Sequence, residues 1–312
     1  MEYGLIGEKL GHSYSKLIHR YLTDYTYDLQ PLSREEFREF MKKKDFKAIN
    51  VTIPYKQEVI PYLYEMDSRA KDIGAVNTIV NKCGHLYGYN TDFYGFEYML
   101  KHNSIEISGK KVLVLGDGGA AKAVRAVLAH LNASGILTVS RKAASGAAGV
   151  TDSAGSAAPP PVPIVTTECQ EVLSACPCFT PAVPAVTTER QTILAPCPCF
   201  SLTVPAVTYE VCYKNHTDAQ IIVNTTPVGM YPEVDASPLN LDTFTSCEAV
   251  VDLIYNPSRT RLARQAEELG IKAVTGLEML VAQAKQAAEY FLDTKIDEAV
   301  IDEIYKKMLE TL

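Results

Sequence analysis

The stretch that most constrains this chain is KVLVLGDGGAAKAV, which covers residues 111–124. An apolar run comes first, Gly116, Gly118 and Ala121 follow in G-x-G-x-x-A spacing, and a helical pattern comes last. In this context the first glycine permits a tight turn, the second lets the backbone approach a pyrophosphate, and the small third residue lets the helix pack against the strand. The pattern predicts a dinucleotide site that also includes Gly119 and Ala120. A plain strand-to-helix turn is the alternative.

The end of the next apolar run indicates which dinucleotide is bound. An NAD site usually has Asp or Glu about 20 residues after the first glycine. Here the run ends at Val139 and is followed by Ser140, Arg141 and Lys142. Arg141 can hold a 2'-phosphate with its planar guanidinium group, and Lys142 adds a point charge. The sequence therefore predicts NADP in preference to NAD, unless both cations are only solvated loop charges.

The rest of the chain alternates short apolar runs with helical patterns, which predicts an α/β protein with parallel strands and crossover helices. The predicted strands are 3–6, 48–51, 111–115, 136–139, 221–224, 249–254 and 272–274. The predicted helices are 15–22, 34–43, 92–102, 120–131, 259–269, 277–291 and 297–309. With 312 residues the chain is long enough for two domains. No strand follows the last helix, so we expect it to pack back on another domain.

Residues 143–206 differ from this pattern and hold ten of the seventeen prolines. Three strings recur there at an offset of 21 residues: VTTE from Val165, CPCF from Cys176 and VPAV from Val183. We interpret the block as a tandem-repeat insertion in a surface loop. We expect it to be dispensable for the fold and replaceable by about 2 to 6 residues. The block follows directly after Arg141 and Lys142. We therefore expect it to affect the affinity for the cofactor rather than the fold.

Composition excludes several functions. The net charge of −7 disfavours nucleic acid, and no apolar run is long enough to cross a membrane. Five of the eight cysteines lie in the repeats, which does not resemble a secreted disulfide framework. The Cys-x-Cys pairs are tighter than usual zinc-ligand spacing, so we expect no metal site. These features indicate a soluble cytoplasmic protein whose oligomeric state the sequence does not give.

Several further strings occur in a fixed order along the chain. They are GHSYSKLIH from Gly11, NVTIPYK from Asn50, GAVNTI from Gly74, GYNTDFYG from Gly88, NTTPVGM from Asn224, DLIYNP from Asp252 and GLEMLVAQA from Gly276. In this order, with the glycine loop among them, they resemble the shikimate dehydrogenase family over residues 1–142 and 207–312. The resemblance implies NADPH-dependent, reversible reduction of 3-dehydroshikimate to shikimate, a small-molecule step of aromatic amino acid biosynthesis.

The resemblance also implies roles for individual residues. Lys56 matches the catalytic lysine and Asp92 its paired carboxylate, although Asp92 could also be the N-cap of the helix that it begins. Ser13 and Ser15 match serines that bind the substrate carboxylate, with helix capping as the alternative. The remaining substrate-binding matches are Thr52, Asn77, Gln283 and Tyr255. The remaining cofactor-binding matches are Asn224, Thr225, Thr226, Met230 and Gly276.

The same resemblance gives the expected domains. Residues 1–101, with helices 277–312 packed back on them, would form a smaller α/β substrate domain. Residues 102–276 would form a Rossmann-type NADP domain interrupted by the insertion 143–206, with the catalytic cleft between the domains. Two alternatives stay open. One is an NAD-using quinate/shikimate dehydrogenase, and the other is a catalytically weakened dinucleotide-binding protein whose repeats contact a partner.

Overall fold

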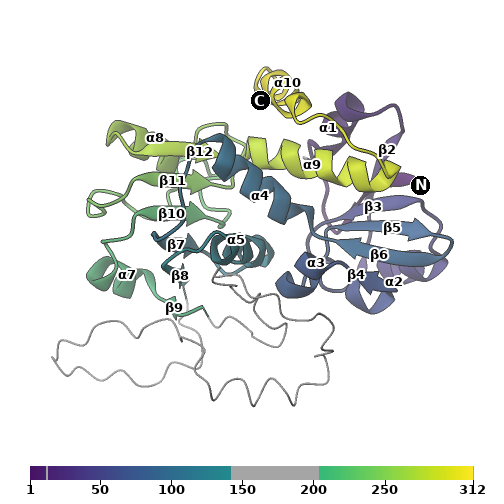
Figure 1. The fold of residues 1–312 in the computed structure, drawn as a ribbon, viewed down its shortest axis with the longest axis horizontal. Helices are drawn as coiled ribbons and strands as arrows, with labels where there is room; N and C mark the ends of the chain where they lie inside the picture. Colours follow the sequence, from purple (N-terminus) through teal and green to yellow (C-terminus); the bar gives the residue numbers. More distant parts are fainter. Residues whose placement is uncertain (12, 142–203, 312) are drawn as a thin grey trace, which may run out of the picture. The chain divides into compact units, whose positions relative to one another are not determined.

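The computed structural model describes residues 1–11, 13–141 and 204–311, which contain two β-sheets with their helices (Figure 1). Residues 1–144 and 201–312 group into one compact unit, and the fold below is that of its described part. Lys142 and residues 143–203, which hold all the predicted repeats except the second VPAV string at 204–207, lie outside the described residues. Among the helices that are described, none has the length and apolar character needed to cross a membrane.

The second sheet along the chain carries the glycine-rich stretch at the end of a central strand. Its strands are β7 (Lys111–Leu115), β8 (Gly135–Val139), β9 (Ala206–Val207), β10 (Ile221–Asn224), β11 (Ala249–Asp252) and β12 (Lys272–Thr275). They run parallel in the order β12-β11-β10-β7-β8-β9. This arrangement confirms the predicted α/β class, and β7 and β10 have the predicted bounds.

Both faces of this sheet are covered by helices, which explains its continuous apolar runs. The helices are α4 (Thr91–His102), α5 (Gly119–His130), α7 (Tyr209–Asn215) and α8 (Arg261–Glu268). Val112 and Val114 of β7 join a core with α4 and α5. Leu113 and Leu115, which point to the opposite face, join a core with α7 and α8.

The first sheet is mixed rather than wholly parallel. Its strands are β1 (Tyr3–Gly7), β2 (Tyr27–Pro31), β3 (Ala48–Val51), β4 (Glu65–Met66), β5 (Thr78–Lys82) and β6 (His85–Tyr89), in the order β2-β1-β3-β5-β6-β4. Strand β5 pairs antiparallel with both β3 and β6. The accompanying helices are α1 (Ser15–Leu22), α2 (Arg34–Lys43), the 3₁₀ turn η1 (Ile60–Tyr62) and α3 (Ser68–Ile73).

The β5–β6 hairpin was not predicted from the sequence. Its turn residues Cys83 and Gly84 both have positive φ, 53° and 85°. Positive φ at both central residues matches the right-handed twist of a two-residue hairpin, and glycine adopts it without strain. The hairpin places the residue before β5 beside the residues after β6, which matters for the site described below.

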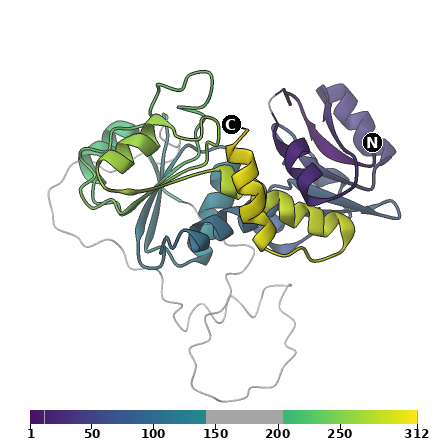
Figure 2. The same ribbon diagram turned by 90° about the horizontal axis from the view of Figure 1, so that it is seen from above.

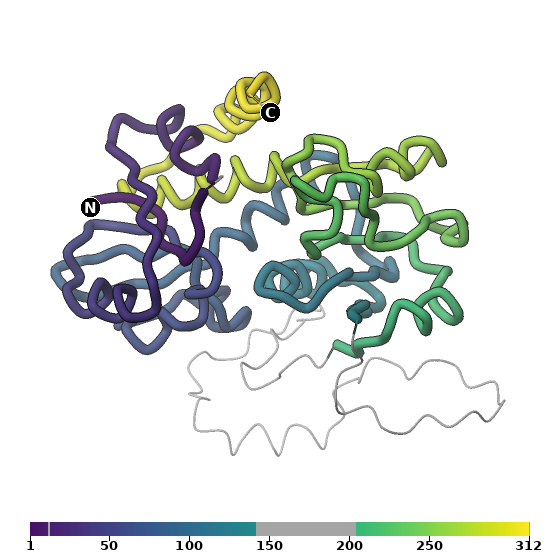
Figure 3. Tube along the Cα trace, turned by 180° about the vertical axis from the view of Figure 1, so that it is seen from behind, coloured from purple at the N-terminus to yellow at the C-terminus, as the bar shows by residue number. Residues whose placement is uncertain are grey.

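Two C-terminal helices complete the described fold. Helix α9 (Leu277–Leu292) packs beside α4 (Figure 3), and α10 (Ala299–Leu309) packs against α9 (Figure 2). Ile301, Ile304 and Met308 of α10 share a core with Ile18 of α1 and Val281 of α9. The last helix therefore packs on α1 and α9.

The edge strand β9 changes one expectation about the insertion. Thr138 pairs with Ala206 and Val139 with Val207 in parallel register, and Pro205 O accepts a 2.9 Å hydrogen bond from Thr138 N–H. Ala206, which composition had placed in the insertion, thus belongs to the sheet. Adjacent parallel strands need a crossover of about a dozen residues or more. The expected replacement by about 2 to 6 residues is therefore too short.

This topology predicts how deletions should behave. Replacing residues 143–203 with about 15 Gly and Ser residues should preserve one cooperative unfolding transition, whereas about 4 residues should detach β9 and lower Tm. Thermal unfolding of the two variants and the intact chain, followed by circular dichroism, measures this. Equal Tm values for the long and short linkers would show that β9 pairing does not require a crossover.

Candidate active site

A polar cluster forms where three strand ends of the first sheet meet. Thr78, the first residue of β5, pairs with Asn50 of β3 and with Tyr89 of β6. The chain that leaves β3 carries Lys56, and the chain that leaves β6 enters α4 at Thr91. The register of β5 with its two neighbours therefore brings together side chains that lie 36 residues apart in the sequence.

Lys56 and Asp92 form the ion pair at the centre of this cluster. Lys56 Nζ lies 2.6 Å from Asp92 Oδ2, and the two side chains are 19% and 13% exposed. The N-cap of α4 is Asn90, whose Oδ1 accepts a bond from Asp92 N–H, so the alternative of Asp92 as the N-cap is wrong. Asp92 lies in the first turn of α4, where the helix dipole favours a negative charge. The Asp92 carboxylate therefore does not cap the helix, and it binds Lys56 instead.

Asn77 fixes the second oxygen of Asp92. Its Nδ2 donates to Asp92 Oδ1 at 2.9 Å. Its Oδ1 accepts from Thr91 N–H at 2.8 Å and from Thr78 Oγ1 at 3.1 Å, which sets the orientation of the amide. Thr91 Oγ1 lies 3.2 Å from both Asn77 Oδ1 and Gln283 Oε1, so α9 contributes to the same network. No motif in the sequence indicates a role for Thr78 or Thr91.

A buried polar layer lies behind this network and was also missed. Asn50 donates to Thr78 Oγ1 at 3.0 Å and accepts from the Tyr27 hydroxyl at 2.7 Å. The His19 ring stacks on the Tyr27 ring with centroids 3.9 Å apart, and its Nδ1 lies 2.7 Å from the Tyr25 hydroxyl. Burial lowers the pKa of His19 to about 3. The layer is therefore neutral, and it supports Asn77 without adding charge to the cluster.

The other predicted substrate-binding residues lie on flanking segments. Ser13 Oγ accepts a 3.3 Å bond from Ser15 N–H, but the N-cap of α1 is Tyr14 and the helix has no side-chain cap bond, so the capping alternative is wrong for both serines. Thr52 N–H donates to Ile6 O at 2.9 Å, and the Thr52 side chain is partly exposed. The ring of Tyr255 meets the edge of the Tyr14 ring with centroids 5.9 Å apart. Within the described chain, hydrogen bonds link Gln283, but none of these flanking side chains, to the Lys56 cluster.

The glycine loop has the shape that a dinucleotide requires. Gly116 has φ +98°, and a Cβ there would lie 2.9 Å from Thr226 Cγ2. Around Gly118 and Gly119 an added Cβ would meet no atom within 4 Å. Gly118 caps α5 with no side-chain bond, so the first N–H groups of that helix keep their hydrogen-bonding capacity for a ligand. Ala120 follows in the first turn. These residues fit a pyrophosphate at the helix N-terminus.

The loop after β10 faces the glycine loop through its threonines. Thr225 Oγ1 donates to Leu115 O at 2.6 Å. Asn224 is fully buried: its Nδ2 donates to Asp252 Oδ1 at 2.9 Å, and its Oδ1 accepts from Thr226 Oγ1 at 2.7 Å. Burial raises the pKa of Asp252 to about 6, although the hydrogen bonds that its carboxylate accepts act to lower that pKa. Asn224 thus positions Thr226, while Met230 is 44% exposed.

The local structure around Gly276 and Arg141, two more predicted cofactor positions, is also described by the structure. A Cβ at Gly276 would collide with the Leu253 carbonyl oxygen, so this turn before α9 requires glycine. Arg141 is exposed just after β8, and Ser140 N–H donates to Val207 O at 3.0 Å. Burial raises the pKa of Tyr209, and the positive charge of Arg141 acts in the opposite direction. Among the residues that the structure describes, no ion pair engages the exposed Arg141 side chain.

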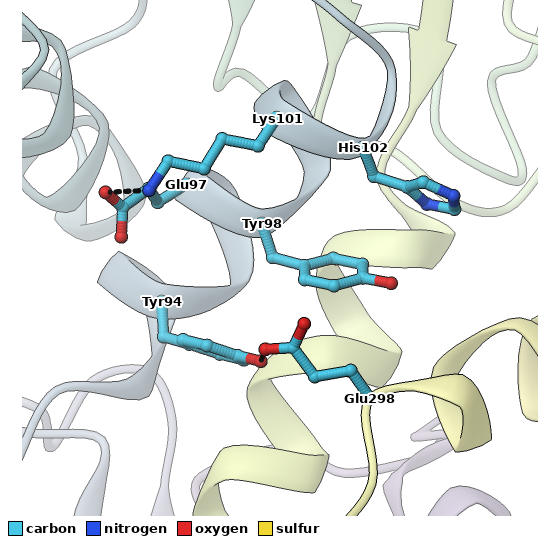
Figure 4. Close-up of a pocket in the computed structure, with 6 residues that line it drawn as sticks. All are labelled: Tyr94, Glu97, Tyr98, Lys101, His102 and Glu298. Atoms are coloured by element: carbon cyan, nitrogen blue, oxygen red, sulfur yellow. Dashed lines mark hydrogen bonds and ion pairs between the residues drawn. The ribbon is translucent and has the colours of Figure 1, made fainter.

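A separate polar pocket of about 490 Å³ lies along α4 (Figure 4). It is lined by Tyr94, Glu97, Tyr98, Lys101, His102 and Glu298. Beside it, His102, Glu278 and Asp302 offer ligand atoms within 4.8 Å of one another. The Glu278 oxygens already bind His102 Nδ1 and Asn103 Nδ2. These groups satisfy one another, and no residue predicted for substrate or cofactor lines the pocket.

Comparison with known proteins gives matches over nearly the whole chain. A model of the shikimate dehydrogenase substrate binding domain matches residues 5–79. Shikimate dehydrogenase (NADP(+)) of Clostridium beijerinckii is 35% identical over 97% of this chain and 96% of its own. A chorismate mutase/shikimate 5-dehydrogenase fusion protein from Clostridium acetobutylicum has a TM-score of 0.76 and 33% identity, covering 99% of this chain and 97% of that one. Shikimate 5-dehydrogenase from Thermus thermophilus, solved with NADP(H) and shikimate, has a TM-score of 0.72 and 25% identity, covering 98% and 99%.

The two glycines of the loop should respond differently to alanine. Gly116→Ala should destabilise the fold by about 1 to 3 kcal/mol, because it forces a Cβ into positive φ against Thr226. Gly118→Ala should leave Tm nearly unchanged yet weaken dinucleotide binding at least about tenfold, because the methyl group occupies the space that a pyrophosphate approaches. Thermal unfolding and titration calorimetry measure the two effects. Unaltered binding in folded Gly118→Ala protein would remove the loop from the site.

Proposed function

The chain belongs to the shikimate dehydrogenase family, and from this premise we propose that it catalyses the NADPH-dependent, reversible reduction of 3-dehydroshikimate to shikimate. This reaction is a step of aromatic amino acid biosynthesis. The observation that carries the proposal is the Lys56–Asp92 pair at 2.6 Å, with Asn77 holding the free carboxylate oxygen. An intact pair of this kind speaks against a catalytically weakened binding protein.

The chemistry requires a proton to move as the carbon centre is reduced. Bound NADPH supplies the hydride to the carbonyl carbon. We assign to Lys56 the proton that the carbonyl oxygen receives, and in the reverse direction the amine takes that proton from the hydroxyl. Asp92 binds the Lys56 amine, and Asn77 keeps the Asp92 carboxylate turned toward Lys56. Asp92 and Asn77 thus set the position of the group that transfers the proton.

Substrate recognition is assigned to the groups around this pair. We propose that Ser13 and Ser15 bind the substrate carboxylate, since short hydroxyl groups near a helix N-terminus suit an anion. Thr52, Asn77 and Gln283 would bind the ring hydroxyls. Tyr255 would close the site from the segment after β11, where it already packs on Tyr14.

Cofactor binding is assigned to the second sheet. The backbone from Gly116 to Ala120 would hold the pyrophosphate, and Arg141, with Ser140 and Lys142 beside it, would hold the 2'-phosphate. Thr225, Thr226, Met230 and Gly276 would line the nicotinamide side. Because the amide of Asn224 is committed to Asp252 and Thr226, we assign it a positioning role behind this loop.

Domain roles and compartment follow from the same assignment. We propose residues 1–101 with 277–312 as the substrate domain and 102–276 as the NADP domain, with the cleft between them. We place the enzyme in the cytoplasm. Cys83, Cys212 and Cys247 are free thiols, which suits a reducing compartment.

Lys56 can be tested by separating turnover from binding. Lys56→Ala should lower kcat by about 10²- to 10⁴-fold with little change in shikimate affinity, because the proton moves only along the reaction coordinate. Ser13→Ala should chiefly raise KM, as expected for binding that is equal in ground and transition states. Steady-state assays at saturating NADP measure both. A Lys56→Ala enzyme altered only in KM would contradict the proton-transfer role.

Cofactor choice can be tested at Arg141. Arg141→Ala should weaken NADP by roughly 10- to 150-fold, which corresponds to the loss of a charged hydrogen bond worth about 1.5 to 3 kcal/mol. NAD affinity should change little, because NAD lacks the 2'-phosphate. Arg264→Ala, at an exposed position of α8, is the matched control. Equal losses of NADP and NAD in titration calorimetry would mean that Arg141 does not contact the 2'-phosphate.

A further inference from the structure

The glycine loop contains a carboxylate where an anionic ligand is expected. Asp117 lies between Gly116 and Gly118, and its side chain is 60% exposed. A negative charge here opposes the approach of phosphate groups to the N-terminus of α5. The glycine spacing itself places no requirement on residue 117, so the acid needs another explanation.

Arg125 neutralises this carboxylate from within the same helix. Its Nη1 lies 2.7 Å from Asp117 Oδ1 and 3.2 Å from Thr138 Oγ1 of β8. The Arg125 side chain is only 17% exposed, so the guanidinium is held between helix and strand. Side chains of a helix lean toward its N-terminus, which lets an arginine in the second turn reach back to the loop.

The location of the pair connects it with the cofactor. Thr138 precedes the last residue of β8, and Arg141 follows two residues after that strand. The guanidinium of Arg125 therefore lies between the pyrophosphate loop and the strand end to which the 2'-phosphate is assigned. Ion pairs with an exposed partner contribute little to stability. We therefore expect the pair to affect the binding of an anionic ligand more than the stability of the fold.

We propose that Arg125 is a specificity-determining residue that acts through Asp117. The ion pair cancels the carboxylate charge, which lets the loop accept a dinucleotide that carries a 2'-phosphate. This inference rests on the proposed NADP site and goes beyond it by assigning two residues outside the glycine pattern. Because NADP carries one more phosphate than NAD, an uncompensated Asp117 repels NADP more strongly.

A double-mutant cycle in the full chain tests the proposal. Titration calorimetry gives Kd for NADP and NAD with the wild type, Arg125→Met, Asp117→Asn and the double variant at low salt. Arg125→Met should weaken NADP about three- to tenfold and NAD less than about twofold. Asp117→Asn in the Arg125→Met background should restore NADP binding to within about twofold of wild type. Asp117→Asn alone should bind NADP equally or more tightly.

Thr138→Val is the matched control, because it removes the other hydrogen bond of Arg125 without altering charge, and it should leave the NADP-to-NAD ratio unchanged. Thermal unfolding verifies that each variant is folded. A double variant as weak as Arg125→Met would overturn the proposal and indicate direct contact between Arg125 and phosphate. Equal weakening of NADP and NAD by Arg125→Met would also overturn it. A wild type that binds NADP without turning over shikimate would contradict the proposed function and leave this binding test intact.

Discussion

The register of β5 between β3 and β6 is the constraint on which the candidate site depends. Thr78 faces Asn50 on one side and Tyr89 on the other, so the segments that leave β3 and β6 start from neighbouring positions. Lys56 and Asp92 can meet only because of this pairing. A slip of one residue would turn alternate side chains to the opposite face and separate them. The buried Asn50 and Thr78 bond to each other across the strands and hold the register that the ion pair needs.

The Lys56 cluster and the glycine loop each contain a carboxylate that is paired with a cation. In each case a carboxylate at the start of a helix faces a cation that is mostly buried: Asp92 faces Lys56, and Asp117 faces Arg125. Asp92 is itself almost buried and held by Asn77, which suits a fixed role beside a proton-transferring group. Asp117 is exposed, so its pair is open to solvent and to ligands. The two pairs thus differ in burial. The buried Asp92 suits the orientation of Lys56, whereas the exposed Asp117 suits an electrostatic effect on a bound ligand.

Much of the fold could be predicted because buried parallel strands are continuous apolar runs. β3, β7 and β10 have the predicted bounds, and α1 and α2 agree to the residue. The β5–β6 hairpin was missed because its turn, Cys83 and Gly84, lacks the usual Asn-Gly or Asp-Gly signal. Strand β9 has two residues, too few for a periodic pattern. Lys56 and Asp92 were named by resemblance, whereas the threonines around Asn77 act through contacts that no sequence spacing reveals.

Helix α9 has a consequence for how the protein loses its structure. Its first turns place Met279 in a core of the second sheet, and its last turns place Ala287 and Phe291 in a core of the first sheet. Unfolding of either core would therefore remove the packing contacts of one end of α9. Because helix formation is itself cooperative, we infer that damage at one end is transmitted along α9. The two sheets should then exchange their most protected amide hydrogens with a common free energy of opening.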